Sequence, residues 1–585
     1  MDPIKVDFSS GGSNKGKSGK TVVIPPNKAG LKIVINLAVT AIIAAVTYYF
    51  YLPAFNIKAV EMYIYFGIVL AAYCATAFVT SGALISPEYT PYARKRTVIP
   101  MIIGLVVAIT AGIGFAASSV FFRAKDYHEI ITPADIKFEE DIKEADFASV
   151  PLLDKDSAAT LATKALSDLF DDQVVSQFTV NSCDTQINLK KMPVRIGTLK
   201  YDNIIKWFTN RKAGLPGYLV IDMTTQKVDY VKVDGGIIYS DADHFNRLLK
   251  RHLRFKYPTA LLGESVFEVD ENDTAWWVCP IYDNTIGLFG GRDVKGVILV
   301  NPTTGECVDY GIEEIRTNEA LKWLDRVYDP DLLVEQYDYY GKYKNGFWNS
   351  VLGQKDVVVT TSGYNYIALN DDVYMYTGVT SITAGDNSIT GFTLINQRTK
   401  DAKFYRVSGA TENAAQEAAQ GKVQQYGYAA TFPLLLNIGK EPTYFMALKD
   451  NSNIVQQYAM VNVNQFTTIV ATGTSISSCL KNYTDLLAEK GIKTDIDVDS
   501  IEDQQNTGAV STDVKKATGA IADIRTAVIN GDSCYYIKLD GTNVYYAVYA
   551  SDFETVVIAN KGSNVEITYK ESSETIIEAE NFTLK

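Results

Sequence analysis

Three long stretches without a charged residue dominate the first part of the chain. Residues 33–57, 62–87 and 97–122 contain no Asp, Glu, Lys or Arg, and they are 25, 26 and 26 residues long. A helix needs about 20 apolar residues to cross a hydrocarbon core ~30 Å thick. A cleavable signal peptide has a shorter apolar core and is not followed by two more such stretches. The sequence therefore predicts an anchor of three transmembrane helices over residues 31–123.

The distribution of basic residues predicts the orientation of these helices. Six lysines lie within residues 1–32, one Lys lies in the first loop near residue 58, and Arg94, Lys95 and Arg96 lie in the second loop. Basic residues accumulate on the cytoplasmic side of short membrane loops. We therefore expect a cytoplasmic, disordered tail over residues 1–30 and an extracytoplasmic location for residues 124–585. Residues 1–123 hold 11 Lys and Arg against 4 Asp and Glu, whereas the rest of the chain is acidic.

Small residues recur every four positions in the second and third predicted spans. This small-residue stripe consists of Gly67, Ala71, Ala75, Gly104, Ala108, Gly112 and Ala116. Such spacing lets helices approach closely, so it predicts packing within the bundle or between copies of the chain. Simple tolerance of Ala and Gly on lipid-facing helices is the alternative. The middle of each span lacks ionisable residues, which disfavours an ion or proton pathway and favours an anchor.

A short pattern repeats three times after the predicted spans. Gly precedes Asp222, Asn301 and Asn396 by five positions, and Thr follows each of them by three. Asp and Asn open turns by bonding their own backbone, so each copy predicts a β-hairpin. Helical patterns at Lys155–Phe170, Asp241–Arg254, Asn318–Val327, Glu412–Gln425 and Ser478–Lys490 accompany the hairpins. We expect α+β units, each an antiparallel sheet with a helix packed on one face.

These units divide the predicted ectodomain. A connector spans residues 124–154, the first two units span 155–328, and the third and a degenerate fourth span 329–494. The second copy, with a helix at Asp241–Lys256 and a hairpin at Val297–Tyr310 whose turn reads Pro-Thr-Thr-Gly-Glu, resembles a PepSY-type module. The runs at Phe289–Val294 and Thr431–Asn437 are similar to an uncharacterised group of Gram-positive bacterial envelope proteins. The resemblance implies an inhibitory or ligand-binding role outside the cytoplasm, and it implies no catalytic residue.

The C-terminal part differs in composition. Residues 495–517 are rich in Asp, Ser, Thr and Gln and predict a linker. Residues 518–585 contain several short strand patterns, including Thr555–Ile558, and predict a small β-barrel that is OB-like. This segment carries 10 Asp and Glu against 5 Lys and Arg. Because affinity for a phosphate backbone comes from cations, nucleic acid is not expected as a partner.

The sequence contains no motif for catalysis or for a bound group. Nucleophile-elbow, zinc-protease and phosphate-loop patterns are missing from the folded part, and the chain has only three His. We therefore expect no catalytic residue, no metal and no cofactor. Cys279 and Cys307 lie on strands of one unit, where a disulfide is conceivable, but we favour reduced, buried thiols.

Aromatic residues gather in one segment of the third unit. The predicted interaction patch consists of Tyr337, Tyr339, Tyr340, Tyr343, Phe347 and Trp348. Tyr and Trp combine rigid apolar area with a polar group, as binding faces require. Packing of a strand into the core between two units is the alternative interpretation.

Together these features predict a membrane-anchored extracytoplasmic protein with a large ligand- or protein-binding ectodomain, structural or regulatory in the cell envelope and not an enzyme. Its expected partners are the bilayer, a protein or second copy of the chain, and a cell-wall polymer. The alternatives are a subunit of an envelope transport or secretion assembly and an enzyme that acts on the cell wall.

Overall fold

The computed structural model describes most of the chain. The described residues are 23, 25–147, 150–169, 176–369, 372–382, 388–494, 496, 514–529, 532–550, 553–570 and 575–585. The predicted tail, except residues 23 and 25–30, and the predicted linker, except residues 496 and 514–517, lie outside them. The chain divides into two compact units, Met1–Ile496 and Asp497–Lys585.

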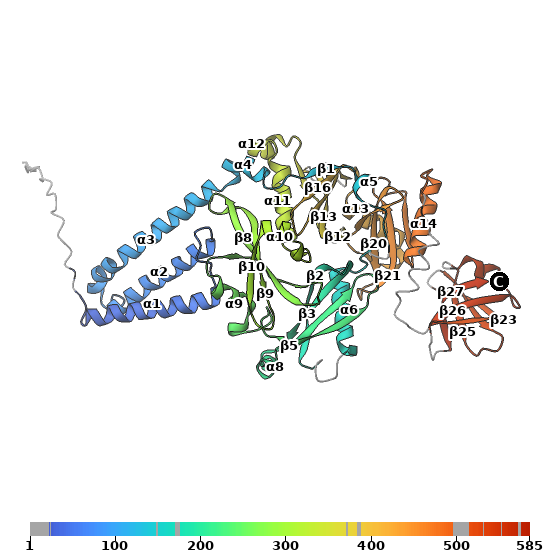
Figure 1. Ribbon diagram of the computed structural model, residues 1–585, viewed down its shortest axis with the longest axis horizontal. Coiled ribbons are helices and arrows are strands. Elements are labelled where there is room, and N and C mark those ends of the chain that lie inside the picture. Colours follow the sequence, from blue (N-terminus) through green and yellow to red (C-terminus); the bar gives the residue numbers. More distant parts are fainter. Residues whose placement is uncertain are drawn as a thin grey trace, which may run out of the picture. The chain divides into compact units, whose positions relative to one another are not determined.

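Three long helices form the N-terminal part of the first unit (Figure 1). They are α1 (Ala29–Tyr51), α2 (Val60–Ser81) and α3 (Thr90–Ala117), and each is long and apolar enough to cross a membrane. Their side chains are mostly exposed, as lipid-facing side chains would be in the isolated chain. Polar contacts join α1 to α2, because the Thr76 hydroxyl donates to the Asn36 side chain, and the Tyr65 hydroxyl donates to the carbonyl of Ala44 at 3.1 Å.

The small-residue stripe lies mainly on the exposed surface of these helices. Gly67, Ala71 and Ala75 are exposed on α2, as are Ala108, Gly112 and Ala116 on α3. Only Gly104 is partly covered, and a Cβ placed there would lie 3.6 Å from the Leu70 side chain. The stripe as a whole therefore does not form the contact between the helices of one chain. A contact between copies of the chain stays a prediction.

Four antiparallel sheets follow. In the middle of each sheet, strands that follow one another along the chain lie side by side. The first contains β2 (Phe178–Leu189), β3 (Met192–Tyr201), β4 (Leu215–Asp222) and β5 (Val228–Ile237). The second contains β6 (Leu261–Leu262), β7 (Val266–Val269), β8 (Ala275–Ile286), β9 (Gly290–Val300) and β10 (Cys307–Gly311). The third contains β11 (Val358–Thr360), β12 (Asn365–Leu369), β13 (Asp372–Ser381), β15 (Gly391–Asn396) and β16 (Ala402–Tyr405), with β1 (Ala134–Ile136) as a parallel edge strand. The fourth contains β18 (Ala429–Ala430), β19 (Leu434–Ile438), β20 (Glu441–Lys449), β21 (Val455–Asn462) and β22 (Val470–Gly473), while β14 (Ser388–Ile389) pairs separately with β17 (Gly409–Ala410).

A helix precedes each sheet along the chain. These helices are α6 (Lys155–Leu169), α9 (Leu249–Lys256), α11 (Pro330–Tyr343) and α13 (Glu412–Lys422), and α14 (Ile476–Glu489) follows the fourth sheet. Further helices are α4 (Val120–His128), α5 (Phe138–Asp141), α8 (Ile204–Asn210), α10 (Ile312–Thr317) and α12 (Gly346–Trp348). The Thr411 hydroxyl caps α13 by accepting from the Ala414 N–H at 3.2 Å, which confirms the predicted start of that helix.

Two predicted helices are wrong in part. The helix predicted at Asp241–Arg254 begins only at Leu249, because Phe245 adopts a positive φ of 53° and Asp243 accepts a 2.7 Å bond from the Trp207 indole. The helix predicted at Asn318–Val327 does not form: α10 ends at Thr317, and only a short 3₁₀ turn at Glu319–Leu321 lies within the predicted range. Tertiary hydrogen bonds to the backbone of the following loop compete with helix formation there, as the candidate site shows.

The predicted hairpins are confirmed, and one interaction closes them all. The side-chain oxygen Oδ1 of Asp222, Asn301 and Asn396 accepts from the backbone N–H groups two and three residues further on, at 2.8–3.0 Å. Asn462 does the same between β21 and β22, at 2.9–3.0 Å. The side chain takes up two backbone donors at the tightest point of each turn, which explains the repeated Asp or Asn.

The second sheet is covered on both faces. Along β8, Trp277 packs into a core shared with the first sheet, whereas the adjacent Val278 packs into a core shared with the third sheet. Successive side chains of a strand point to opposite faces, so this strand must be apolar at nearly every position. The second sheet therefore joins the first and third sheets into one body.

This sheet also docks on the ends of the long helices. Arg254 in α9 donates through Nε to the carbonyl of Leu52, at the C-terminal end of α1, at 3.0 Å. Lys58, which precedes α2, forms a 2.8 Å ion pair with Asp283 in β8. After α3, the Ser118 hydroxyl accepts two backbone N–H groups of the β8–β9 turn, at 2.9 and 3.0 Å. All three helices are thus linked to the second sheet by polar contacts.

The second unit is a closed five-stranded barrel. Its strands are β23 (Val514–Ile529), β24 (Asp532–Leu539), β25 (Tyr545–Tyr549), β26 (Asn564–Lys570) and β27 (Ile576–Leu584). They close in the order β23-β24-β25-β27-β26, and β25 pairs with β27 in parallel. The strand predicted at Thr555–Ile558 is instead a 3₁₀ helix, whose Val556 is buried in the barrel core. β23 also begins four residues before the predicted barrel boundary at 518.

Candidate functional site

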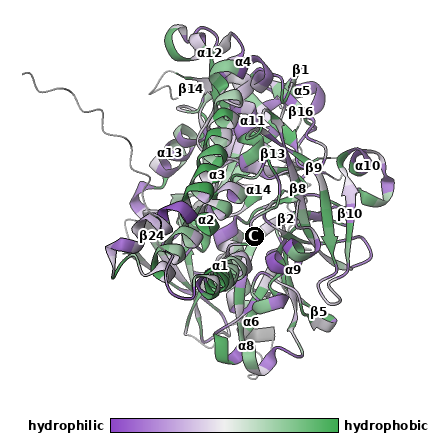
Figure 2. Ribbon diagram, turned by 90° about the vertical axis from the view of Figure 1, so that its left-hand side faces the viewer, coloured by the Kyte–Doolittle hydropathy of each residue, from purple (hydrophilic) through white to green (hydrophobic). Residues whose placement is uncertain are grey.

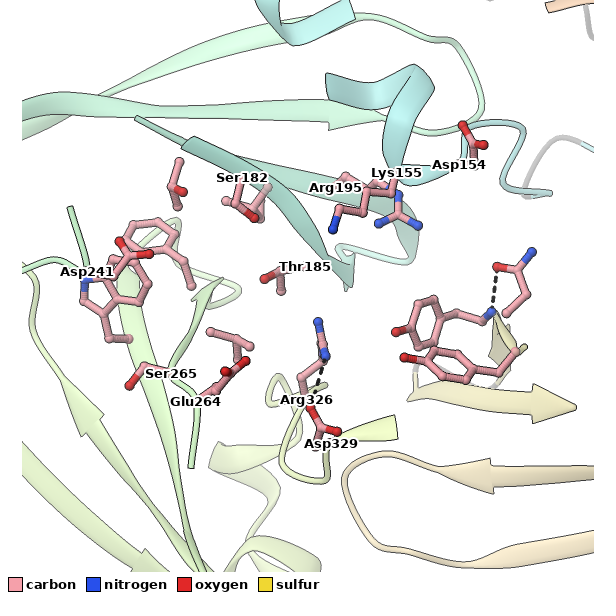
Figure 3. A pocket seen from close by; sticks show the side chains of 18 of the residues that line it. Asp154, Lys155, Ser182, Thr185, Arg195, Asp241, Glu264, Ser265, Arg326 and Asp329 are labelled. Carbon is pink, nitrogen blue, oxygen red and sulfur yellow. Dashed lines mark hydrogen bonds and ion pairs between the residues drawn. The ribbon is translucent and has the colours of Figure 1, made fainter. Parts of the chain in front are cut away.

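A cleft of about 540 Å³ lies where the sheets of the first unit meet. The first sheet contributes Ser182, Thr185 and Arg195, the second contributes Phe267 and Trp277, and the third contributes Tyr366. Phe432, between β18 and β19, brings the fourth sheet to the same cavity. Figure 3 shows charged and hydroxyl side chains that converge on it from different elements. The cleft therefore depends on the assembly of the sheets and not on any one of them.

Two arginines line this cleft. Arg195 in β3 is 5% exposed, and its Nη1 donates to the carbonyl of Cys183 at 3.2 Å. Burial lowers the pKa of Arg195, and the positive charge of Arg326 acts in the same direction. Arg326 lies in the loop before α11, and its guanidinium is 4.0 Å from the Asp329 carboxylate. A guanidinium stays protonated in proteins, so both groups offer charged donors at the cleft wall.

Glu268 in β7 positions the loop that carries Arg326. Its carboxylate is fully buried and accepts from the backbone N–H groups of Asp325 and Arg326, each at 2.9 Å. Burial is the largest influence on this group and raises the pKa of Glu268 to about 7, although the two N–H groups and the Arg326 charge oppose it. Asp325 in turn accepts from the backbone N–H of Asn188 in β2, at 2.6 Å. These bonds hold the loop in place and compete with the helix predicted for it.

Carboxylates at the rim mainly support the walls. The pKa of Asp154 lies below its ordinary value. Burial by itself would raise this pKa, but the hydrogen bonds from Lys449 and Ser157 lower it by more. The Asp154–Lys449 pair is 2.6 Å long and joins the connector before α6 to the fourth sheet. Asp329 caps α11 by accepting from the Asp331 N–H at 2.9 Å. Two of the acidic groups at this cleft therefore have structural partners.

Aromatic side chains complete the lining. Tyr364 and Tyr366 contact edge to face, with ring centroids 5.9 Å apart. Burial raises the pKa of the Tyr366 phenol, so it stays a neutral hydroxyl group. The Trp277 indole donates to the carbonyl of Tyr239 at 2.8 Å, which fixes its ring. Aromatic faces beside hydroxyls and charged donors suit a ligand that presents both an apolar face and hydrogen-bonding groups.

The predicted aromatic patch lies elsewhere and is helical, so the alternative of a strand is wrong. Its first four tyrosines belong to α11, where Tyr337 is buried in the core. Tyr339 contacts Tyr127 of α4 at 4.7 Å between ring centroids, and Tyr340 stacks on His128 at 4.8 Å. Most of the patch therefore docks α11 on α4 within the chain and takes no part in the cleft.

Phe347 and Trp348 form the end of this patch, on α12. Their rings lie 5.1 and 5.7 Å from the ring of Phe121, the second residue of α4. Trp348 nevertheless stays 63% exposed.

The cysteines and histidines offer no reactive centre at the cleft. Cys279 and Cys307 are both free thiols, and burial raises the pKa of Cys279 to about 11, which keeps it protonated. The Cys307 sulfur lies 3.7 Å from Nε2 of His252. Within the described ranges, no three His, Cys, Asp or Glu side chains lie close enough together to hold a metal ion.

Comparison with known proteins adds no fold or family. No protein-family model and no curated protein matches the chain. Among solved structures, a crystal structure of an ACO/RPE65 chimera aligns at 9% identity, over 71% of this chain and 66% of that chain, with a TM-score of 0.13. A score this low does not indicate a shared fold.

Proposed function

We propose that this protein is anchored in a bacterial cell membrane with its N-terminus in the cytoplasm and residues 124–585 outside, where its ectodomain binds a ligand without transforming it. The observation that carries the proposal is the cleft between sheets that are themselves joined to three helices long and apolar enough to cross a membrane. Binding sites lie preferentially in such concave junctions between packed elements. The role is structural or regulatory.

The chemistry of the cleft favours a segment of cell-wall polymer as the ligand. Sugar rings present an apolar face that stacks on aromatic side chains and hydroxyl groups that bond to charged donors and acceptors. Trp277, Tyr364 and Tyr366 supply the first kind of contact, and Arg195 and Arg326 supply the second. A polymer segment with phosphate groups would also pair with the two guanidinium groups.

We also propose a fold class for the second sheet and for the second unit. A helix followed by an antiparallel meander supports a PepSY-like classification of the second sheet, and the Asn301–Thr304 turn falls within it. The closed order of the five barrel strands, with one parallel pair, supports an OB-like classification of the second unit. PepSY-type modules are associated with binding outside the cytoplasm, which agrees with the proposed role.

Binding of wall-polymer fragments to the full-length protein tests this function. We expect oligomers of N-acetylglucosamine or of glycerol phosphate to bind to the full-length protein in nanodiscs. Isothermal titration calorimetry measures their affinity. Arg326→Ala should weaken the affinity at least about tenfold, because it removes charged hydrogen bonds. Thr185→Trp should weaken it similarly by filling the cleft.

Arg406→Ala is the matched control, because Arg406 pairs with Asp135 at an exposed site and does not line the cleft. Its affinity should equal that of the unmodified protein. Equal affinity in all four proteins, or no binding of either oligomer, would refute a wall-polymer ligand in this cleft.

A further inference from the structure

A cluster of large apolar side chains is exposed beside the end of α3. We call it the aromatic foot, and it consists of Phe121, Phe122, Trp348, Val351 and Leu352. These side chains are 46, 67, 63, 52 and 76% exposed, respectively. Its three aromatic rings are neighbours, because the ring of Phe121 lies 4.8 Å from that of Phe122 and 5.7 Å from that of Trp348, and Val351 and Leu352 lie in the turn that directly follows Trp348. Exposed patches of this kind on soluble surfaces mark interaction sites.

The foot is an extension of the surface of the membrane-spanning helices. α3 ends at Ala117 and α4 begins at Val120, so Phe121 and Phe122 follow the span directly. In Figure 1, α4 and α12 lie beside the end of α3, and in Figure 2 they lie above it when the helices face the viewer. Ile113, in the last turns of α3, is 65% exposed as well. The apolar surface thus continues from the span onto the foot.

Two parts of the fold fix the foot at this level. Tyr127 of α4 donates its hydroxyl to the carbonyl of Ser118 at 2.7 Å, so α4 is bonded to the end of α3. α11 docks on α4 through Tyr339, and its C-terminal end leads directly into α12 and the turn Asn349–Gly353, which carries Val351 and Leu352. The foot is therefore held against the end of the span and is not a free loop.

The polar residues around the foot match the surface of a bilayer. Arg123 and Lys125 follow it on α4, Lys342 and Lys344 precede α12, and Lys355 follows the turn. Arg123, Lys125 and Lys342 also form ion pairs with acidic residues three or four positions away. Tryptophan concentrates at the level of the lipid headgroups, where its ring is apolar and its N–H is hydrated. Basic side chains around an apolar face pair with lipid phosphates in interfacial segments.

We infer that the aromatic foot inserts into the headgroup region of the bilayer that α1–α3 cross, in the leaflet on the side of the sheets. The occupant is lipid because the foot continues a lipid-facing surface and carries the residues of an interfacial anchor. The insertion adds a contact point away from the bundle axis. It thereby fixes the tilt of the sheets, and the height of the cleft, relative to the membrane. The inference shares the membrane spans with the proposed function, but it depends neither on the cleft ligand nor on which side of the membrane the sheets face.

Quenching of Trp348 by lipid tests the inference on the full-length protein in nanodiscs. The fluorescence of Trp348 is obtained as the difference between the unmodified protein and Trp348→Phe. With lipids brominated near the carbonyl end of the acyl chains, we expect about half of this fluorescence to be lost. In the Trp348→Phe background, Ile454→Trp is the matched control, because Ile454 is 54% exposed in the β20–β21 turn of the fourth sheet. The control tryptophan should not be quenched.

A second variant separates insertion from mere proximity. Leu352→Asp places a charge on the most exposed residue of the foot, so it should abolish the quenching of Trp348 while the apparent melting temperature stays unchanged. Equal quenching of Trp348 and of the control would overturn the inference. The inference would also be overturned if Trp348 were not quenched and a cross-link at position 351 joined two copies of the chain, because a second copy would then cover the foot. None of these readouts requires the cleft to bind a polymer, so a failure here is distinct from a failure of the proposed function.

Discussion

Asp372→Ala should lower the free energy of unfolding of the first unit by about 3–5 kcal/mol, because it leaves a buried cation without its partner. Both carboxylate oxygens of Asp372 pair with the Arg398 guanidinium, at 2.7 and 2.8 Å. The side chain of Arg398 is only 8% exposed. Its Nη1 also donates to the carbonyl of Ile315 in α10, so the pair joins the second sheet's C-terminal helix to the third sheet.

Thermal unfolding of the full-length protein in nanodiscs measures this effect. Asp135→Ala is the matched control, because it breaks a pair whose side chains are 74 and 60% exposed, and no measurable change is expected. The double variant Asp372→Leu/Arg398→Met should regain most of the loss, since it leaves no buried charge. Similar melting temperatures for Asp372→Ala and Asp135→Ala would show that the buried Asp372–Arg398 pair matters no more for stability than an exposed pair.

The stability of the same unit should fall as the pH rises from about 5 to about 8, and Glu268 should contribute to this fall. Burial raises the pKa of Glu268 from 4.5 to about 7. Between these values the folded protein holds a proton that the unfolded chain has released, so folding is favoured at low pH and the advantage disappears above about pH 7. The shift corresponds to about 3 kcal/mol.

Apparent melting temperatures at several pH values, for the unmodified protein and for Glu268→Gln, measure this contribution. The amide cannot titrate, so the variant should show a smaller slope between pH 5 and 8 than the unmodified protein. Burial also raises the pKa of Glu412, and the contribution of that group is the same in both proteins. Asp154 does not interfere, because its pKa lies below 3.8 and its contribution changes only under more acidic conditions. Identical slopes in the two proteins would assign the pH dependence to other groups.

Local chemistry made part of this fold predictable. The spans follow from missing charges, and the hairpins follow from Asp222, Asn301 and Asn396, whose side chains bond backbone groups two and three residues away. Such signals act within a few residues, and a single sequence records them directly. Asp329 and Pro330 are a further local signal, because Asp caps α11 and Pro occupies its first turn. They mark the start of a helix, which we did not predict for this aromatic segment.

Tertiary interactions account for what the sequence does not reveal. The loop before α11 contains a helical pattern, but the buried Glu268 binds its backbone from a strand more than 50 residues earlier. The cleft is the extreme case, because Arg195, Arg326 and Tyr366 lie on different sheets or loops and share no motif. Only the packing of the second sheet between the first and third brings them together.

The sheets that form the cleft should face the outside of the cell, and cysteine labelling on intact cells tests this location most directly. Ile454→Cys lies in the fourth sheet, and Ile85→Cys lies between α2 and α3, at positions 54 and 89% exposed. We expect a membrane-impermeant maleimide to label Ile454→Cys on intact cells, above the level of the unmodified protein. Ile85→Cys should react only after the membrane is permeabilised. Labelling of Ile85→Cys but not of Ile454→Cys on intact cells would contradict the claim.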